Sequence, residues 1–165
     1  MNRKFNYIYV AIVFALISCS GDNNQTEKEF FKAIIENTAY KASEIRAVHL
    51  GESIQVSSEN SENNSAINFN LKNYQGVGSY AIGDSSENEN IVNYALSDDT
   101  GVLLTLWSLN KTSSSIGITP GSIEITYDDG KVIEGKFSTL HVYNYHGTKQ
   151  IMVIKNGSFK ADYDF

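Results

Sequence analysis

Cysteine and proline are nearly absent from this chain, which has one of each among 165 residues. A lone thiol, Cys19, excludes a disulfide framework and a thiolate metal cluster, since both need further cysteines. The longest apolar run, residues 7–17, is too short to cross a bilayer, which takes about 20 residues. We therefore expect the fold to be stabilised by a hydrophobic core, and a chain of this length can bury one.

Basic residues are also scarce: 13 Lys and Arg stand against 19 Asp and Glu, for a net charge of −6. Arg3 and Lys4 precede the apolar run, so removal of residues 1–18 would lower the net charge to −8. Such a chain has no basic patch that could release counterions from a phosphate backbone. Nucleic acid is therefore not expected as a partner.

The cysteine follows a segment typical of a secretory signal peptide, with a basic start, an apolar stretch and small residues at its end. Leu16-Ile17-Ser18-Cys19 resembles the lipobox of bacterial lipoproteins, although Ile17 stands where Ala or Ser is commoner. The resemblance implies cleavage after Ser18 and acylation of Cys19. Each buried CH₂ contributes about 0.8 kcal/mol, so several acyl chains make a lasting membrane anchor. Secretion without lipidation is the alternative.

Residues 19–29 are polar and predict a flexible tether of about 30 Å between the lipid and a folded domain formed by residues 30–165. Ser20 rather than Asp follows the cysteine, which favours the outer membrane under the sorting rule of enterobacterial lipoproteins. We expect a protein held on the outer membrane through acylated Cys19, on its periplasmic side or at the cell surface.

From residue 30 onward apolar and polar residues alternate, β-branched and aromatic residues are frequent, and Gly, Asn and Asp mark turns. This pattern predicts an all-β domain, either an antiparallel β-sandwich or a partly closed barrel, built from consecutive hairpins. Strands are expected at residues 45–49, 53–57, 66–72, 79–82, 90–96 and 101–109. Residues 26–35 also allow a helix, because Thr26 and Glu29 have the spacing of a capping box.

The C-terminal hairpin is predicted at Asn156-Gly157. These two residues suit a type I′ turn, which would pair Ile154 with Phe159. Upstream, residues 102–109 are apolar on both faces, unlike their neighbours, and are predicted to form a central strand that is covered on both sides.

A second hairpin is predicted around a three-residue loop at 128–130, with Gly130 in the left-handed region. That loop would set Ile125 opposite Ile133 on one face and Glu124 opposite Glu134 on the other. Two like charges in such a pair are tolerable only in water.

A series of short motifs occurs in order along residues 30–165. They are Phe31-x-Ala33-x-Ile35, Tyr40-x-Ala42, Gly78-Ser79-Tyr80-x-Ile82-Gly83, Gly121-Ser122-Ile123-x-Ile125-Thr126, Ile133-x-Gly135-x-Phe137 and Ile154-x-Asn156-Gly157-x-Phe159. Together they resemble a family of uncharacterised Bacteroidota lipoproteins. Its members open with a β-hairpin, so the resemblance favours strands at residues 31–42. It implies a location and a fold but no chemistry.

Acidic residues give weak signals of catalysis. Asp99-Thr100-Gly101 matches the motif of aspartic proteases, but a single copy between two strands is typical of a turn. The predicted pair of Glu124 and Glu134 would be about 5 Å apart, the separation of retaining glycosidases. Exposed glutamates on a hairpin are the commoner explanation, so no catalytic residue is predicted.

Metal binding is not predicted either. His141 and His146 would lie on opposite faces of a strand, and His49 could join them only through folding. Residues 84–90 place oxygen ligands at alternate positions as a calcium loop does, but they lack its glycine and its bidentate acid. We expect no metal and no cofactor.

Aromatic residues make up 12% of the chain and are the remaining candidates for binding. His141, Tyr143 and Tyr145 share one strand face and, with Trp107, could stack on sugar rings or fill a partner's pocket; half-buried sheet surface is the alternative. The expected function is a lipid-anchored, non-catalytic binding or structural module with a protein or glycan partner. A lipocalin-like carrier of a small apolar ligand and a small hydrolase are the other possibilities.

Overall fold

The structure is a computed structural model that describes residues 28–83, 89–110, 121–144 and 151–164. Within these ranges every regular element is a strand, and no helix there is long and apolar enough to span a membrane. The all-β prediction is therefore confirmed. The strands are β1 (Phe30–Ile35), β2 (Thr38–Lys41), β3 (Glu44–Leu50), β4 (Ser53–Asn60), β5 (Ser65–Leu71), β6 (Gly78–Ile82), β7 (Ile91–Ser97), β8 (Leu103–Leu109), β9 (Gly121–Asp128), β10 (Val132–Tyr143) and β11 (Ile151–Asp162).

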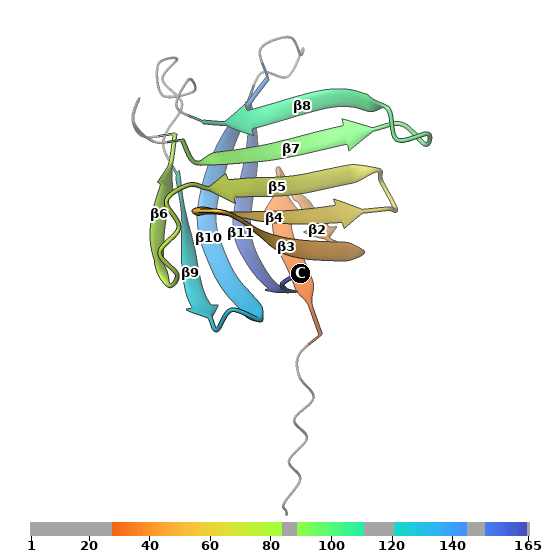
Figure 1. The fold of residues 1–165 in the computed structure, drawn as a ribbon. Helices are drawn as coiled ribbons and strands as arrows, with labels where there is room; N and C mark the ends of the chain where they lie inside the picture. The colour runs from red at the N-terminus through yellow and green to blue at the C-terminus, as the bar shows by residue number, and fades with distance from the viewer. Residues whose placement is uncertain (1–27, 84–88, 111–120, 145–150, 165) are drawn as a thin grey trace, which may run out of the picture.

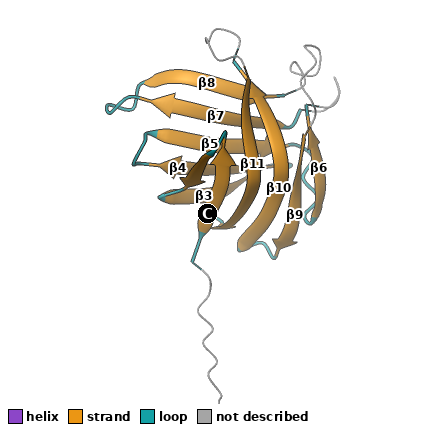
Figure 2. Cartoon of the chain, turned by 180° about the vertical axis from the view of Figure 1, so that it is seen from behind, coloured by secondary structure: helices purple, strands orange, loops and turns teal. Residues whose placement is uncertain are grey.

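All 11 strands belong to one sheet, in the order β2-β1-β11-β10-β8-β7-β5-β4-β3, with β9 added beside β10 and β6 beside β9. The sheet folds over on itself. Strands β3, β4, β5, β7 and β8 form one layer, and β1, β9, β10 and β11 cross behind it (Figure 1). Figure 2 shows the same two layers from the other side. The arrangement is an antiparallel sandwich that stays open, rather than a closed barrel.

Among the described residues, sparse backbone pairing connects the layers at their margins. Strands β8 and β10 pair at a single position, where Tyr143 lies opposite Ser108. At another margin, Tyr163 makes an isolated parallel bridge to Ala47 of β3. The sheet is therefore continuous, but only weakly paired where β8 meets β10.

Aromatic side chains fill the space between the layers. Phe31, Phe69 and Phe159 are almost completely buried, and the ring of Phe159 lies 5.9 Å from that of Phe31 and 5.1 Å from that of Phe69. Burial of each such side chain is worth about 1.5–3 kcal/mol, so this cluster supplies much of the stability that no disulfide can add.

The first segment is a hairpin, as the family resemblance implies. Strand β1 buries Phe31, Ala33 and Ile35 at alternate positions, and Ile35 pairs with Thr38 of β2 across a tight turn. Alternation with a period of two therefore outweighs the capping-box spacing at Glu29. That carboxylate instead accepts a hydrogen bond from the backbone N–H of Asp162.

The predicted C-terminal hairpin is wrong. Strand β11 runs without interruption through Asn156 and Gly157, and these two residues together lie opposite Ala33 of β1, where the register shifts. Asn156 has a φ of 51°, which is the left-handed conformation that the turn prediction also relied on. The Asn-Gly pair therefore forms a β-bulge, and Ile154 and Phe159 lie along the same strand instead of pairing.

Two glycine–phenylalanine pairs hold β10 against β11. Gly135 lies opposite Phe159, and Phe137 lies opposite Gly157. A Cβ added at Gly157 would be 1.9 Å from the Phe137 ring, and one added at Gly135 would be 2.4 Å from the Phe159 ring. Each ring therefore covers the glycine opposite it. This explains why Gly and Phe are two residues apart both in Ile133-x-Gly135-x-Phe137 and in Ile154-x-Asn156-Gly157-x-Phe159.

The second predicted hairpin is correct in its connection and wrong in its register. Gly130 has a φ of 78° in the loop between β9 and β10, as expected. The loop consists of residues 129–131 instead of 128–130, so that Asp128 already lies opposite Ile133 at the turn. After a one-residue bulge, Ile125 lies opposite Gly135 rather than Ile133, and Glu124 lies opposite Lys136 rather than Glu134. The displaced loop removes the predicted like-charge pair, because Glu124 now forms an ion pair with Lys136 at 3.3 Å.

Candidate binding surface along strand β8

Strand β8 is not the covered central strand that its sequence predicts. Val102, Leu103, Leu104 and Leu106 are 59%, 55%, 64% and 42% exposed, respectively. We call these four residues the leucine edge. Contiguous exposed apolar side chains are uncommon on soluble proteins and mark sites of interaction.

The exposure follows from the pairing of β8. On one side the strand pairs with β7 from Leu109 to Leu103, whereas on the other side its only pair with β10 is at Ser108. From Leu103 to Leu106, none of the strands that the structure describes pairs with this second side. Such an unpaired edge presents backbone donors and acceptors to a further strand.

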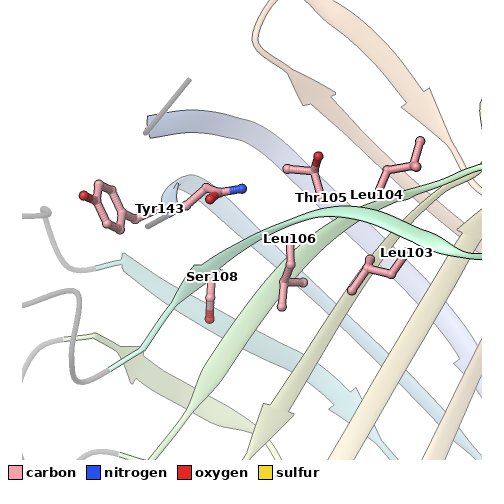
Figure 3. Close-up of a pocket in the computed structure, with 7 residues that line it drawn as sticks. Leu103, Leu104, Thr105, Leu106, Ser108 and Tyr143 are labelled. Carbon is pink, nitrogen blue, oxygen red and sulfur yellow. The ribbon is translucent and has the colours of Figure 1, made fainter. Parts of the chain in front are cut away.

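A bulge in β8 distributes the leucines over both faces. The register with β7 shifts so that Thr105 lies opposite Leu96 while Leu103 lies opposite Ser97. Figure 3 shows the result: Leu104 and Thr105 point to one side of the strand, and Leu103 and Leu106 point to the other. Neither face of this part of β8 is therefore covered.

An open hollow of about 330 Å³ lies along this edge, lined by residues of β8 together with Tyr143 and Asn144 (Figure 3). No charged residue occurs between Thr100 and Asn110. The surface can therefore offer apolar contact and backbone hydrogen bonds, but it has no charged side chain that could bind an ion or transfer a proton.

The predicted aromatic residues lie around this edge in different ways. Trp107 is only 6% exposed, and its ring packs 5.6 Å from that of Tyr94. His141 and Tyr143 are half-buried at alternate positions of β10, on one face as expected, and Tyr143 lines the hollow. Tyr145 lies outside the described residues, as does Cys19. A role in ligand binding stays a prediction for Trp107, His141, Tyr143 and Tyr145.

The protease-like motif is a turn in the structure. The carboxylate of Asp98 accepts hydrogen bonds from the backbone N–H groups of Thr100 and Val102 and from the hydroxyl of Thr100. These bonds lower the pKa of Asp98, and the hydrogen bond from the Thr100 hydroxyl has the largest effect. The carboxylate of Asp99 accepts a bond of 2.8 Å from the side-chain amide of Asn64. Both acids therefore stabilise the connection between β7 and β8.

The remaining candidates do not converge on a common site. Glu134 pairs with Lys160 at 3.1 Å, separately from Glu124. Among the described residues no group of three or more His, Cys, Asp or Glu could hold a metal ion. His146 and residues 84–88 of the calcium-like segment lie outside the described residues, and the Asn90 side chain bonds the backbone of Lys72 and Ala81.

An aromatic and acidic cluster that no sequence pattern predicts lies around Asp128. The hydroxyls of Tyr74 and Tyr163 both donate to Oδ2 of Asp128, at 2.6 and 3.1 Å. The His49 ring stacks on Tyr163 at 4.7 Å, and Tyr80 stacks on Tyr74 at 5.4 Å. Burial, followed by the nearby Asp128 carboxylate, raises the pKa of Tyr163. No local spacing could reveal this cluster, because its members come from widely separated segments.

Comparison with known proteins gives a family and no activity. The profile of a family described as a domain of unknown function (DUF6252) matches residues 27–161. No curated protein matches the sequence. Among solved structures, the amphioxus green fluorescent protein GFPA1 is similar at 8% identity, over 72% of this chain and 79% of that one, with a TM-score of 0.16. A likeness that weak carries no inference.

Proposed function

Because the chain belongs to the DUF6252 family, whose function is unknown, we propose a function from its own sequence and structure. The protein is a lipid-anchored, non-catalytic binding module of the outer membrane that takes up a protein partner along the leucine edge. The observation that carries the binding role is the open edge of β8, which exposes apolar side chains on both faces.

The chemistry of that edge favours a protein over a sugar or a small ion. A strand whose backbone groups from Leu103 to Leu106 pair with no described strand on one side, and whose side chains there are uncharged, matches an extended polypeptide, which can add a strand to the sheet. A glycan would need polar side chains along its length, and the hollow has some at Ser108 and Tyr143, but the exposed stretch beside them consists mainly of leucines.

The position of the edge fits a partner that lies away from the anchor. Strand β8 lies at one end of the molecule, whereas β1 begins near the opposite end (Figures 1 and 2). The chain leads from Phe30 back to the proposed anchor at Cys19. A tether attached at the end opposite β8 leaves the leucine edge accessible to a partner.

No observation favours a carrier or a hydrolase. A carrier needs an enclosed cavity, and here Phe31, Phe69 and Phe159 pack against one another between the layers. A hydrolase needs several polar groups that converge on one cleft, whereas the candidate acids Asp98, Glu124 and Glu134 are engaged in a turn and in separate ion pairs.

The anchor is tested by intact-mass spectrometry of the protein extracted from membranes, beside a Cys19→Ala variant. We expect acyl mass on a wild-type chain that begins at Cys19, recovery in the outer-membrane fraction, and neither result for the variant. A wild-type chain that is cleaved but carries no acyl mass would refute the anchored function.

A further inference from the structure

We propose that the leucine edge pairs with a second copy of this chain, so that β8 of each copy extends the sheet of the other across a two-fold axis. This inference rests on the proposed binding role of the edge and names its partner. Closed two-fold dimers are the commonest assemblies of identical chains, and each chain then uses the same surface.

The unpaired stretch is symmetric under such an axis. It runs from Leu103 to Leu106, with Leu104 and Thr105 on one side of the strand and Leu103 and Leu106 on the other (Figure 3). Reversing the strand direction about the point between Leu104 and Thr105 leaves this pattern unchanged. An antiparallel pair therefore places Leu103 opposite Leu106 of the second copy on one face and Leu104 opposite Thr105 of the second copy on the other. The two-fold axis generates each of these pairs a second time with the copies exchanged.

Charge also favours a second copy at this place. The chain has a net charge of −6, so most contacts between two copies bring like charges together. The stretch from Thr100 to Asn110 has no charge at all, and antiparallel pairing moves the Asp98 and Asp99 turns to opposite ends of the joined strands. Two copies can meet along β8 without the repulsion that applies elsewhere.

The contact between β8 and β10 within each chain limits how far the two copies can pair along β8. Beyond Leu106 the edge is occupied at Ser108 by Tyr143 of β10. Val102 and Leu103 of the second copy would then approach Tyr143, whose ring lines the same hollow. The short backbone ladder is thereby extended by apolar contact at both ends.

The first test is disulfide cross-linking of a Thr105→Cys variant in whole cells, where the chain is present whether or not it is anchored. Strands in a sheet are about 4.8 Å apart and residues along a strand about 3.4 Å, so the two introduced cysteines would have Cα atoms about 6 Å apart, within disulfide range. A Val77→Cys variant, exposed but far from β8 in the chain, reports chance collisions. We expect a covalent dimer from the first variant and not from the second; equal yields, or no dimer from either, overturn the proposal.

The second test changes the charge of the paired positions in the Thr105→Cys background. Leu103→Glu combined with Leu106→Glu places carboxylates opposite each other and should reduce the cross-linked fraction at least about 10-fold. Leu103→Glu combined with Leu106→Lys carries as many new charges but pairs opposite signs, and should restore the dimer. Equal cross-linking by both double variants, with unchanged circular dichroism, overturns the register.

The two proposals fail separately in these experiments. Chains that carry acyl mass on Cys19 but do not cross-link through position 105 refute the dimer and leave the anchor standing. Chains that cross-link without acyl mass refute the anchor and leave the dimer standing.

Discussion

Gly157 is the position where a single added methyl group tests the architecture most directly. In the structure Gly157 lies in the middle of β11, opposite Phe137, with three atoms of that ring 1.9–2.4 Å from where a Cβ would be. Real Cβ atoms essentially never come within 3.0 Å of a heavy atom outside their own residue and its chain neighbours, so Gly157→Ala must displace the ring. If Gly157 were instead the second residue of an exposed turn, no ring would be near it.

The expected cost follows from what the ring loses. Phe137 is buried and lies 6.2 Å from Phe31, so its displacement disturbs the aromatic core. Overpacking costs about 1–3 kcal/mol, and complete loss of a buried phenylalanine costs about 3–5 kcal/mol. We expect Gly157→Ala to lower the free energy of unfolding by about 3 kcal/mol, which corresponds to roughly 6–12 °C in Tm for a domain of this size.

Urea unfolding of a double-mutant cycle measures this coupling. Phe137→Ala alone should cost about 3–5 kcal/mol, and with the ring gone the further change Gly157→Ala should cost almost nothing. The two effects should therefore fall short of additivity by about 2–3 kcal/mol. Additive effects, or a Gly157→Ala variant within about 0.5 kcal/mol of wild type, would show that the ring does not cover the glycine.

Three further outcomes can be measured on the same protein. Burial raises the pKa of Tyr40 to about 12, so the stability that Tyr40 contributes should be complete below pH 10 and fall by about 1.4 kcal/mol per pH unit from pH 10 to 12. The raised pKa values of Tyr74 and Tyr163 add losses of their own, so Tyr40→Phe should lessen the total loss in urea titrations by the Tyr40 part. Asp128→Asn removes the negative charge beside the Tyr163 hydroxyl, so the pKa of Tyr163 should fall, as followed by ultraviolet titration, and stability should drop by about 1–2 kcal/mol. Lys136→Met breaks an exposed ion pair with Glu124 and should change the free energy of unfolding by less than about 1 kcal/mol in chemical denaturation.

The positions of most strands follow from local pattern alone. Alternation of Phe31, Ala33 and Ile35 with polar residues indicates a strand with one buried face, and the structure confirms it. The same holds for β3 to β7, whose predicted and observed ranges differ by only a few residues. Local alternation is sufficient here because each of these strands has one face on the core.

Pairing partners could not be obtained in this way. Asn156-Gly157 has the conformational preferences of both a hairpin turn and a bulge, and the choice depends on Ala33 and Phe137, which lie far away in the chain. An apolar run such as residues 102–109 is likewise compatible with a central strand covered on both faces and with an edge strand whose apolar side chains are exposed. Neighbouring strands, rather than the run itself, decide between these two.

The sequence by itself determined the all-β class, the alternation of buried and exposed residues, and the lack of a disulfide within the chain, which has one cysteine. It also predicts the lipid anchor at Cys19. Only the tertiary structure decided that β11 passes straight through Asn156, that Tyr74 and Tyr163 share Asp128, and that the leucine edge is open. The physical reason is that side-chain periodicity is a property of a few neighbouring residues, whereas register and edge exposure arise from contacts between segments that meet only when the chain folds.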